Sequence, residues 1–230
     1  MDAFRIVFLA HSGFLVELSD CVLLFDVYRD PRGAAERALS GAKPVYVFVS
    51  HSHGDHFNPR IYDWADRAAG YFVHEDCRPR RTVSSVRLMR PGDRLDGPEL
   101  TVSMYGSTDE GGSFLVRCGG RTFFHAGDLN WWHWAGEPDE ENDAARDAYF
   151  QELDSLDGAA VDVAFFPVDA RQAVAREWGV TEFLCRVDVK ELLVPMHAFG
   201  SRWCPSYGFR WRFPAVPLWI PSEEGEELVK

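Results

Sequence analysis

Apolar runs of two kinds, alternating and continuous, divide the chain into short strands and a few helices. The most apolar run, VYVFV at residues 45–49, follows a proline and predicts a strand that is buried on both faces. Further strands are expected at 4–9, 14–18, 21–27, 71–74, 83–89, 99–105, 113–118, 121–125, 161–169 and 191–197. Helices are expected at 34–40, 59–69, 143–156 and 180–187. Strands and helices therefore follow one another along the chain, which predicts an α/β fold.

Two similar strand segments stand 100 residues apart. GFLVE at 13–17 and SFLVR at 113–117 are each followed by a two-residue turn and a second apolar strand. Repeated hairpins of this kind indicate two similar halves that pack together. Since no stretch of linker composition separates the halves, residues 1–230 are expected to form one domain.

The composition narrows the class of protein. The chain has 230 residues, 46% of them hydrophobic, and a formal net charge of −12. This content excludes a disordered chain, and no apolar run is long enough to span a membrane. Arg5 and His11 interrupt the apolar N-terminal stretch, so it is not read as a signal peptide and a cytoplasmic location is expected.

The cysteines argue against a disulfide-stabilised or zinc-knuckle protein, and the charge argues against a nucleic-acid-binding protein. The five cysteines are odd in number, widely spaced and without a C-x-x-C pair, so they predict reduced thiols and neither a disulfide framework nor a zinc knuckle. The acidic balance argues against a nucleic-acid partner. A small-molecule substrate is therefore the expected partner. The oligomeric state is left open.

The strongest chemical signal is the segment SHSHGDH at 50–56. It follows the buried strand directly and places His51, His53, Asp55 and His56 within six residues. Imidazole and carboxylate groups are the usual ligands of zinc and its neighbours. In extended chain, residues two apart point to the same side, so His51 and His53 are expected to share one metal. The adjacent pair Asp55 and His56 then suits a second metal.

This segment resembles the H-x-H-x-D-H motif of the metallo-β-lactamase superfamily, in a lactonase-like branch. The resemblance implies a four-layer αββα sandwich with metals at one sheet edge. FHAGD at 124–128 resembles the family strand whose final aspartate, here Asp128, bridges two metals. PMH at 195–197 resembles the late strand whose histidine, here His197, binds the second metal. The implied metal ligands are His51, His53, Asp55, His56, Asp128 and His197.

One position departs from the family pattern. The family has a histidine in a G-H-T segment as third ligand of the first metal, and here Ser107 occupies that place. Asp109, or His133 in the segment WWHW at 131–134, can replace it. A weakened first site is favoured, with His133 facing the pocket as a contact for substrate or water.

Other polar residues are candidates for substrate contact or for support of the metal ligands. His11 and Asp26 belong to the segments that resemble the opening hairpin of the lactonase-like branch. Asp169 and Arg171 follow a buried strand; a surface ion pair is the favoured interpretation, and a place in the pocket is the alternative. The full set is His11, Asp26, Ser107, Asp109, His133 and Asp169. His74 and His125 are interpreted as structural.

These residues predict a metal-dependent hydrolase with one or two divalent ions. Zinc is favoured, and manganese or iron are alternatives. Asp55 is the expected catalytic residue, holding the attacking water or accepting its proton. The substrate is expected to be a cyclic ester, another ester or a phosphodiester. Two alternatives stand beside this one: a metal-binding protein without turnover, and an RNA-processing nuclease of the same superfamily.

Overall fold

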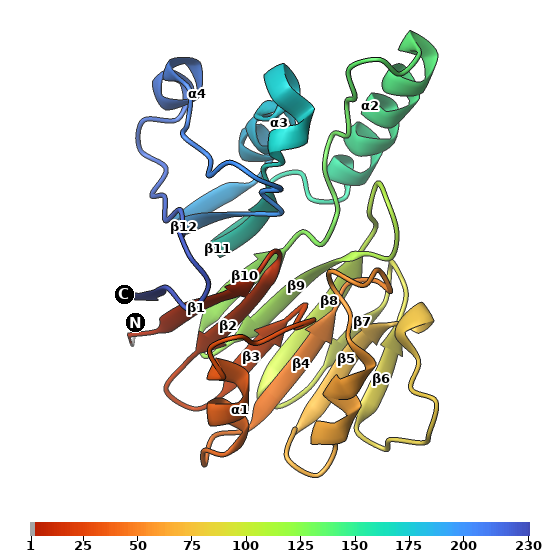
Figure 1. Ribbon diagram of the computed structural model, residues 1–230, viewed down its shortest axis with the longest axis vertical. Helices are drawn as coiled ribbons and strands as arrows, with labels where there is room; N and C mark the ends of the chain where they lie inside the picture. The colour runs from red at the N-terminus through yellow and green to blue at the C-terminus, as the bar shows by residue number, and fades with distance from the viewer. Residues whose placement is uncertain (1–2) are drawn as a thin grey trace.

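Two sheets packed face to face form the centre of the molecule (Figure 1). The computed structural model describes residues 3–230, so residues 1 and 2 of the expected domain lie outside the described part. The first sheet has the order β13 (Glu227–Val229), β1 (Arg5–Ala10), β2 (Gly13–Glu17), β3 (Val22–Phe25), β4 (Val45–Val49), β5 (Gly70–His74), β6 (Val86–Met89). The second has the order β12 (Asp188–Met196), β11 (Ala160–Pro167), β10 (Arg121–His125), β9 (Ser113–Cys118), β8 (Leu100–Tyr105), β7 (Arg94–Asp96).

Helices cover the outer faces of both sheets. On the first sheet they are α1 (Ala34–Leu39) and the 3₁₀ segment η1 (Pro59–Trp64); α2 (Asp139–Asp154) and α3 (Trp178–Arg186) pack on the second. The remaining short elements are η2 (Glu75–Cys77), η3 (Ala170–Ala175) and α4 (Tyr207–Arg212). The expected αββα architecture is confirmed. Within the described residues, no helix is long and apolar enough to cross a membrane.

The burial of β4 explains its continuous apolar sequence. Val45, Val47 and Val49 pack with α1 and η1 on the outer face, whereas Tyr46 and Phe48 point into the space between the sheets. Because both faces of the strand are covered, neither row can be polar without loss of buried apolar area. The prediction of a strand buried on both faces is confirmed.

The repeated hairpins occupy equivalent places in the two sheets. β2 pairs antiparallel with β3, and β9 pairs antiparallel with β10. Both hairpins contribute large rings to the same core, including Phe14, Phe25 and Phe114. The sequence repeat therefore corresponds to two similar halves facing each other.

Several predicted boundaries shift for identifiable reasons. The strand expected over 21–27 ends at Phe25, because Asp26 has a left-handed backbone with φ of 44°. The helix expected over 59–69 is a 3₁₀ segment that ends at Trp64. Two short edge strands, β7 and β13, were not predicted. Their side chains are mostly exposed, so their sequences carry no apolar alternation.

The carboxyl ends of several strands lie at one edge of the sandwich. β3 and β4 run parallel, as do β10, β11 and β12. β1 and β8 each lie two antiparallel steps away from one of these strands and so end at the same edge. The loops that follow these strands therefore meet there.

Candidate metal centre

The histidine-rich loop after β4 folds back on itself at this edge. The backbone N–H groups of His56 and Phe57 both donate to the carbonyl of His53, at 3.0 and 2.8 Å. This turn leaves His51 and His53 on one side, with His51 Nε2 only 3.1 Å from His53 Nδ1. The expected pairing of these two histidines agrees with the geometry.

Asp128 lies between two groups of histidines. Its Oδ2 is 3.4 Å from His51 Nε2, and its Oδ1 is 3.2 Å from His56 Nε2 and 3.5 Å from His197 Nε2. The two oxygens of one buried carboxylate thus face different histidines, as a carboxylate that bridges two ions would.

Two glycines allow the loops to approach this closely. A Cβ on Gly127, which has φ of 54°, would lie 2.8 Å from the Ser50 Cβ. A Cβ on Gly111 would lie 2.1 Å from the Ser50 carbonyl oxygen. Larger residues at either position would push the Asp128 loop or the 106–112 loop away from His51.

A second group of side chains lies beside the first. His11 follows β1 and His197 follows β12, and both have left-handed backbones, with φ of 53° and 56°. The N–H of His197 donates to the carbonyl of His11 at 3.3 Å, and the two rings lie 4.2 Å apart. His11 Nε2 is 3.4 Å from Asp55 Oδ2. Strained backbone of this kind concentrates at functional sites, where surrounding contacts maintain it.

Asp26 and Ser50 fix the orientation of two of the imidazoles. Asp26 Oδ2 accepts from His56 Nδ1 at 2.8 Å and from the Ser50 hydroxyl at 2.7 Å. Because the single hydroxyl proton goes to this carboxylate, Ser50 Oγ must accept the proton of His51 Nδ1, 2.9 Å away. Both histidines therefore direct their Nε2 atoms toward Asp128. The role of Ser50 was not predicted, although its hydroxyl directly precedes the motif.

Asp169 supports His197 in the same way. Its Oδ2 accepts from His197 Nδ1 at 3.1 Å, and Arg171 pairs with the same carboxylate at 2.6 Å. Asp169 is fully buried. The interpretation of Asp169 and Arg171 as a surface ion pair is therefore wrong, because β11 ends inside the site and not at the outer surface.

The charges of the cluster differ from one side chain to the next. Burial would raise the pKa of Asp128, but His197 and His56 hold it well below its usual value. Burial opposes charge on His56, yet Asp128 and Asp26 raise its pKa to about 10. Burial and the neighbouring His56 lower the pKa of His51 to about 4. His51 is therefore a neutral imidazole near pH 7, the form that binds a metal.

The cluster fits divalent ions. Two sets of ligand atoms each lie within 4.8 Å of one another: those of His51, His53 and Asp128, and those of His11, Asp55, His56 and His197. Among the described residues, His11 Nε2, His56 Nε2 and Asp128 Oδ1 are buried without a hydrogen-bond partner. His56 Nε2 and Asp128 Oδ1 are 3.2 Å apart, yet they are not aligned for a hydrogen bond. Buried polar atoms that converge without bonding to one another are suited to a shared cation.

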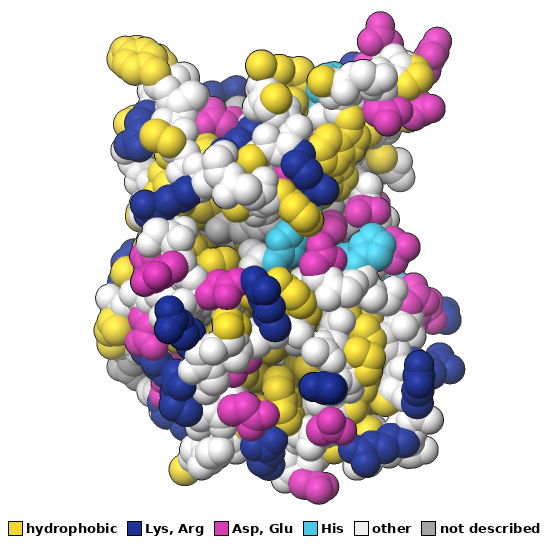
Figure 2. Space-filling view, viewed as in Figure 1, with side chains coloured by type: hydrophobic (Ala, Val, Ile, Leu, Met, Phe, Trp, Pro, Cys, Tyr) yellow, Lys and Arg dark blue, Asp and Glu magenta, His cyan; other side chains and the backbone are white. Residues whose placement is uncertain are grey.

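A cavity of about 330 Å³ opens over these ligands. Figure 2 shows histidines next to acidic side chains at mid-height on this face of the molecule. The indoles of Trp132 and Trp134 stack on each other, 5.6 Å apart, along one wall. Arg171 lies over the rings of Trp134 and Phe199. The remaining lining residues are His53, Asp55, Thr108, Asp109, Asp128 and His197.

The two residues considered as replacements for the missing histidine have different positions. Asp109 lines the cavity, and burial together with the neighbouring Asp128 raises its pKa. His133 is not among the lining residues, and its ring packs 4.8 Å from Trp178. The expectation that His133 faces the pocket is therefore wrong. The loop turns Trp132 and Trp134 inward and His133 outward.

Ser107 is not among the residues that line this cavity, and its hydroxyl accepts from the Asp109 N–H at 3.4 Å. Outside the centre, His125 is a buried histidine with both nitrogens bonded. Its Nε2 donates to the Ser12 carbonyl at 2.8 Å, and its Nδ1 accepts from the Gly127 N–H at 3.2 Å. The structural interpretation of His125 is confirmed. His74 is also buried, at the end of β5 and away from the cluster.

Known proteins resemble this chain in sequence and in fold. No protein-family model matches it. A UPF0173 metal-dependent hydrolase of Desulforamulus reducens is 29% identical over 141 residues, which cover 54% of this chain and 61% of that relative. The match thus spans less than two thirds of the relative's length.

Solved structures match over the whole chain. Igni18, a metallo hydrolase from Ignicoccus hospitalis, has a TM-score of 0.62 at 18% identity and covers 100% of this chain and 99% of its own. YhfI from Bacillus subtilis, a metallo-β-lactamase fold protein, has a TM-score of 0.58 at 14% identity, with full coverage of both chains. The fold is that of the metallo-β-lactamases.

Proposed function

We propose that the protein is a metal-dependent hydrolase that cleaves an ester-type bond in a small molecule. The observation that carries this proposal is the position of Asp128, whose two carboxylate oxygens face separate histidine groups amid buried, unpaired ligand atoms. The name of the relative from Desulforamulus reducens supports the same class of activity. The bond classes considered are cyclic esters, other esters and phosphodiesters.

The proposed ligands divide between two positions. His51, His53 and Asp128 would hold the first ion, and Asp55, His56, Asp128 and His197 the second. Zinc suits this donor set, with manganese or iron as alternatives. Bound divalent ions supply Lewis acidity, which polarises a carbonyl or phosphoryl oxygen and makes water more acidic.

Asp55 is the proposed proton acceptor for the attacking water. Its side chain lines the cavity and is 39% exposed, so it can reach a water in that space. His11 Nε2 lies 3.4 Å from Asp55 Oδ2 without a hydrogen bond between them, which leaves the carboxylate free to accept a proton. Asp109 adds a second carboxylate to the same wall. We propose that it takes the place of the absent third histidine beside His53.

The aromatic wall and Arg171 would bind and shield the substrate. The stacked indoles of Trp132 and Trp134 limit the access of bulk water on one side. Arg171 is held by Asp169 and by two aromatic rings, so its guanidinium is fixed before a substrate binds. A fixed cation at this place can face negative charge that develops on the substrate.

A hydrolysis screen tests the proposal. Protein stripped by a chelator is reloaded with zinc, manganese or ferrous ion and assayed with δ-valerolactone, p-nitrophenyl acetate and bis(p-nitrophenyl) phosphate. We expect turnover of at least one substrate in proportion to bound metal, and a loss of about 100-fold or more in Asp128→Asn. Asp20→Asn, which changes an exposed turn carboxylate, should keep full activity. Failure of the loaded protein on all three substrates would contradict the proposal, as would equal turnover by Asp128→Asn.

A further inference from the structure

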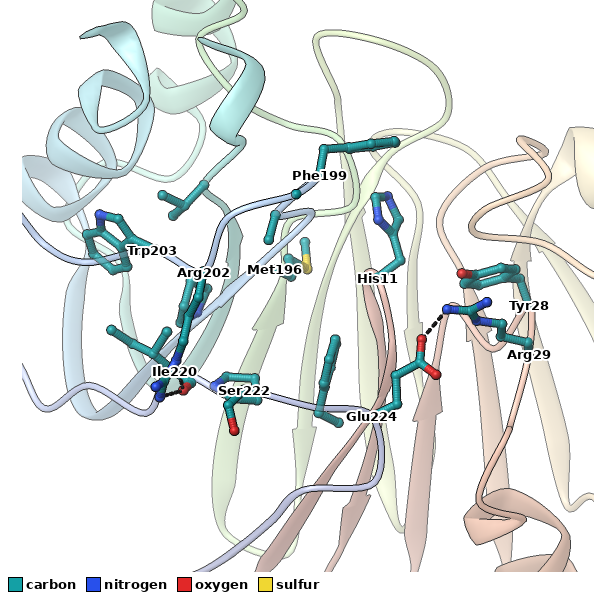
Figure 3. A pocket seen from close by; sticks show the side chains of 16 residues that line it. His11, Tyr28, Arg29, Met196, Phe199, Arg202, Trp203, Ile220, Ser222 and Glu224 are labelled. Carbon is teal, nitrogen blue, oxygen red and sulfur yellow. Dashed lines mark hydrogen bonds and ion pairs between the residues drawn. The ribbon is translucent and has the colours of Figure 1, made fainter. Parts of the chain in front are cut away.

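A larger cavity lies next to the metal centre. Its volume is about 480 Å³, within the range of small-molecule pockets. Figure 3 shows His11 and Phe199 along one side of it, and Trp203, Ile220 and Ser222 at the other end. The wall is completed by the end of β12 and by the C-terminal segment 220–224.

The two cavities meet at Phe199. This residue lines both of them, has a left-handed backbone with φ of 36°, and is 41% exposed. Its ring is 4.7 Å from the ring of His11 and 4.9 Å from that of His197. The larger cavity therefore begins where the ligand cluster ends.

Nine of the sixteen residues that line the larger cavity are carbon-rich, and its surface is less polar than that of the cavity over Asp128. The carbon-rich lining residues are Phe8, Val168, Pro195, Met196, Ala198, Phe199, Trp203, Ile220 and Pro221. The charged groups at the rim are paired with the protein itself. Arg29 pairs with Glu224, and the Arg202 guanidinium donates to the Ile220 carbonyl (Figure 3). Because these cations already have partners, the space favours a nonpolar group over an anion.

We propose that this cavity binds a nonpolar arm of the substrate, an alkyl or aryl group, while the bond to be cleaved lies at the metal centre. The inference rests on the hydrolase function proposed above. It assigns the specificity of the enzyme to substrates with a sizeable hydrophobic group, for which the larger cavity offers more space and a less polar surface than the cavity over Asp128. The arm passes His11 and Phe199, and Ile220 and Trp203 surround its far end.

Hydroxamates provide a probe with two separable parts. The head group chelates a divalent ion, and the tail extends from it, so a series with acetyl, butyryl, hexanoyl and octanoyl groups changes only the tail. The dissociation constant of each compound is measured by calorimetry on the zinc-loaded protein. Each methylene that leaves water should tighten binding by up to about fourfold. We expect the octanoyl compound to bind at least about 30-fold more tightly than acetohydroxamate.

The variant Ile220→Trp fills the far end of the cavity without altering a proposed ligand. It should leave the affinity for acetohydroxamate unchanged and abolish most of the gain from the longer tails. Val229→Trp, the same kind of change on an exposed position of β13, is the matched control and should behave as the wild type.

Equal dissociation constants across the wild-type series would overturn the inference, and this result needs no variant. A gain that survives in Ile220→Trp would also overturn it, because the tail would then bind elsewhere. Failure of acetohydroxamate to bind the zinc-loaded wild type would be a different result. It would contradict the metal-dependent function itself, and with it the inference.

Discussion

Asp26 holds the ring of His56 in place, because its Oδ2 accepts a hydrogen bond of 2.8 Å from His56 Nδ1. Burial alone would raise the pKa of Asp26, but nearby His125 and His56 lower it to about 2. The carboxylate is therefore ionised near pH 7 and also fixes Ser50 and, through it, His51. One buried charge thus positions a histidine of each proposed metal position.

Replacing Asp26 by Asn should weaken metal binding, because an amide cannot accept all the hydrogen bonds that the carboxylate accepts. Loss of such a supporting group costs about 10- to 100-fold in metal affinity. Competition with a chromophoric chelator measures the change. Asp20→Asn is the control, since its carboxylate is exposed in the turn between β2 and β3. An unchanged dissociation constant in Asp26→Asn would refute this positioning role.

The absent third histidine makes a second comparison informative. Asp109 lines the cavity with His53 and Asp128, whereas the Ser107 hydroxyl bonds to the local backbone. Asp109→Asn should therefore reduce the affinity for the first metal by about 10-fold or more, and Ser107→Ala should change it little. The same chelator titration separates them. If Ser107→Ala had the larger effect, the proposed role of Asp109 would be wrong.

His133 should matter for stability and not for metal. Its ring packs on Trp178 outside the cavity, so His133→Ala removes an aromatic contact worth about 1 kcal/mol. Urea unfolding should show this loss, while metal content and turnover stay at the wild-type level. A metal-depleted but normally stable variant would show that the ring reaches the centre after all.

The burial of Tyr149 leads us to expect that the protein loses stability at high pH. Its hydroxyl donates to the Gly179 carbonyl at 2.6 Å inside the second sheet's helical layer, and burial raises its pKa well above 10. The unfolded chain ionises near pH 10, so this contribution to folding is complete below pH 10 and falls as pH rises beyond it. Each such tyrosine lowers the free energy of unfolding by about 1.4 kcal/mol for every pH unit above 10, up to its pKa in the folded protein.

Tyr149→Phe cannot ionise and should therefore show a shallower decline in the free energy of unfolding between pH 10 and 11. Urea titrations at pH 8, 10 and 11 measure the slope for both proteins. Tyr62 and Tyr71 are also buried with raised pKa values, so some decline remains in the variant. Identical slopes would show that the phenol of Tyr149 does not control this behaviour.

Local and repeated signals in the sequence predicted an α/β fold with two similar halves, and the resemblance to the metallo-β-lactamase superfamily supplied the four-layer sandwich. The run at 45–49 has no polar position, which fits only a strand covered on both faces, and the repeated hairpins fit two facing sheets. The short edge strand β13 could not be predicted in this way. It forms only because residues 227–229 pair with β1 at the opposite end of the chain.

The metal centre likewise combines features that are local in the sequence with contacts between distant segments. His51, His53, Asp55 and His56 could be grouped because they are close in sequence. Asp128 and His197 could be added only because their segments resemble two strands of the metallo-β-lactamase superfamily. The contact of His11 with His197 depends on where β1 lies relative to β12, which no local pattern contains. The loop at 131–134 has no strand periodicity that would tell which of its rings face inward. The prediction for His133 failed for this reason.

The metal content of His51→Ala with His53→Ala tests the central claim most directly. Wild-type protein and variant are loaded with zinc, freed of excess metal and measured by elemental analysis, and circular dichroism checks the fold. The double variant should lose at least one metal equivalent per chain and keep its secondary structure. The control, His74→Ala with His133→Ala, removes two histidines outside the cluster and should retain the wild-type content. Equal metal content in the folded His51→Ala, His53→Ala variant and the wild type would contradict the account.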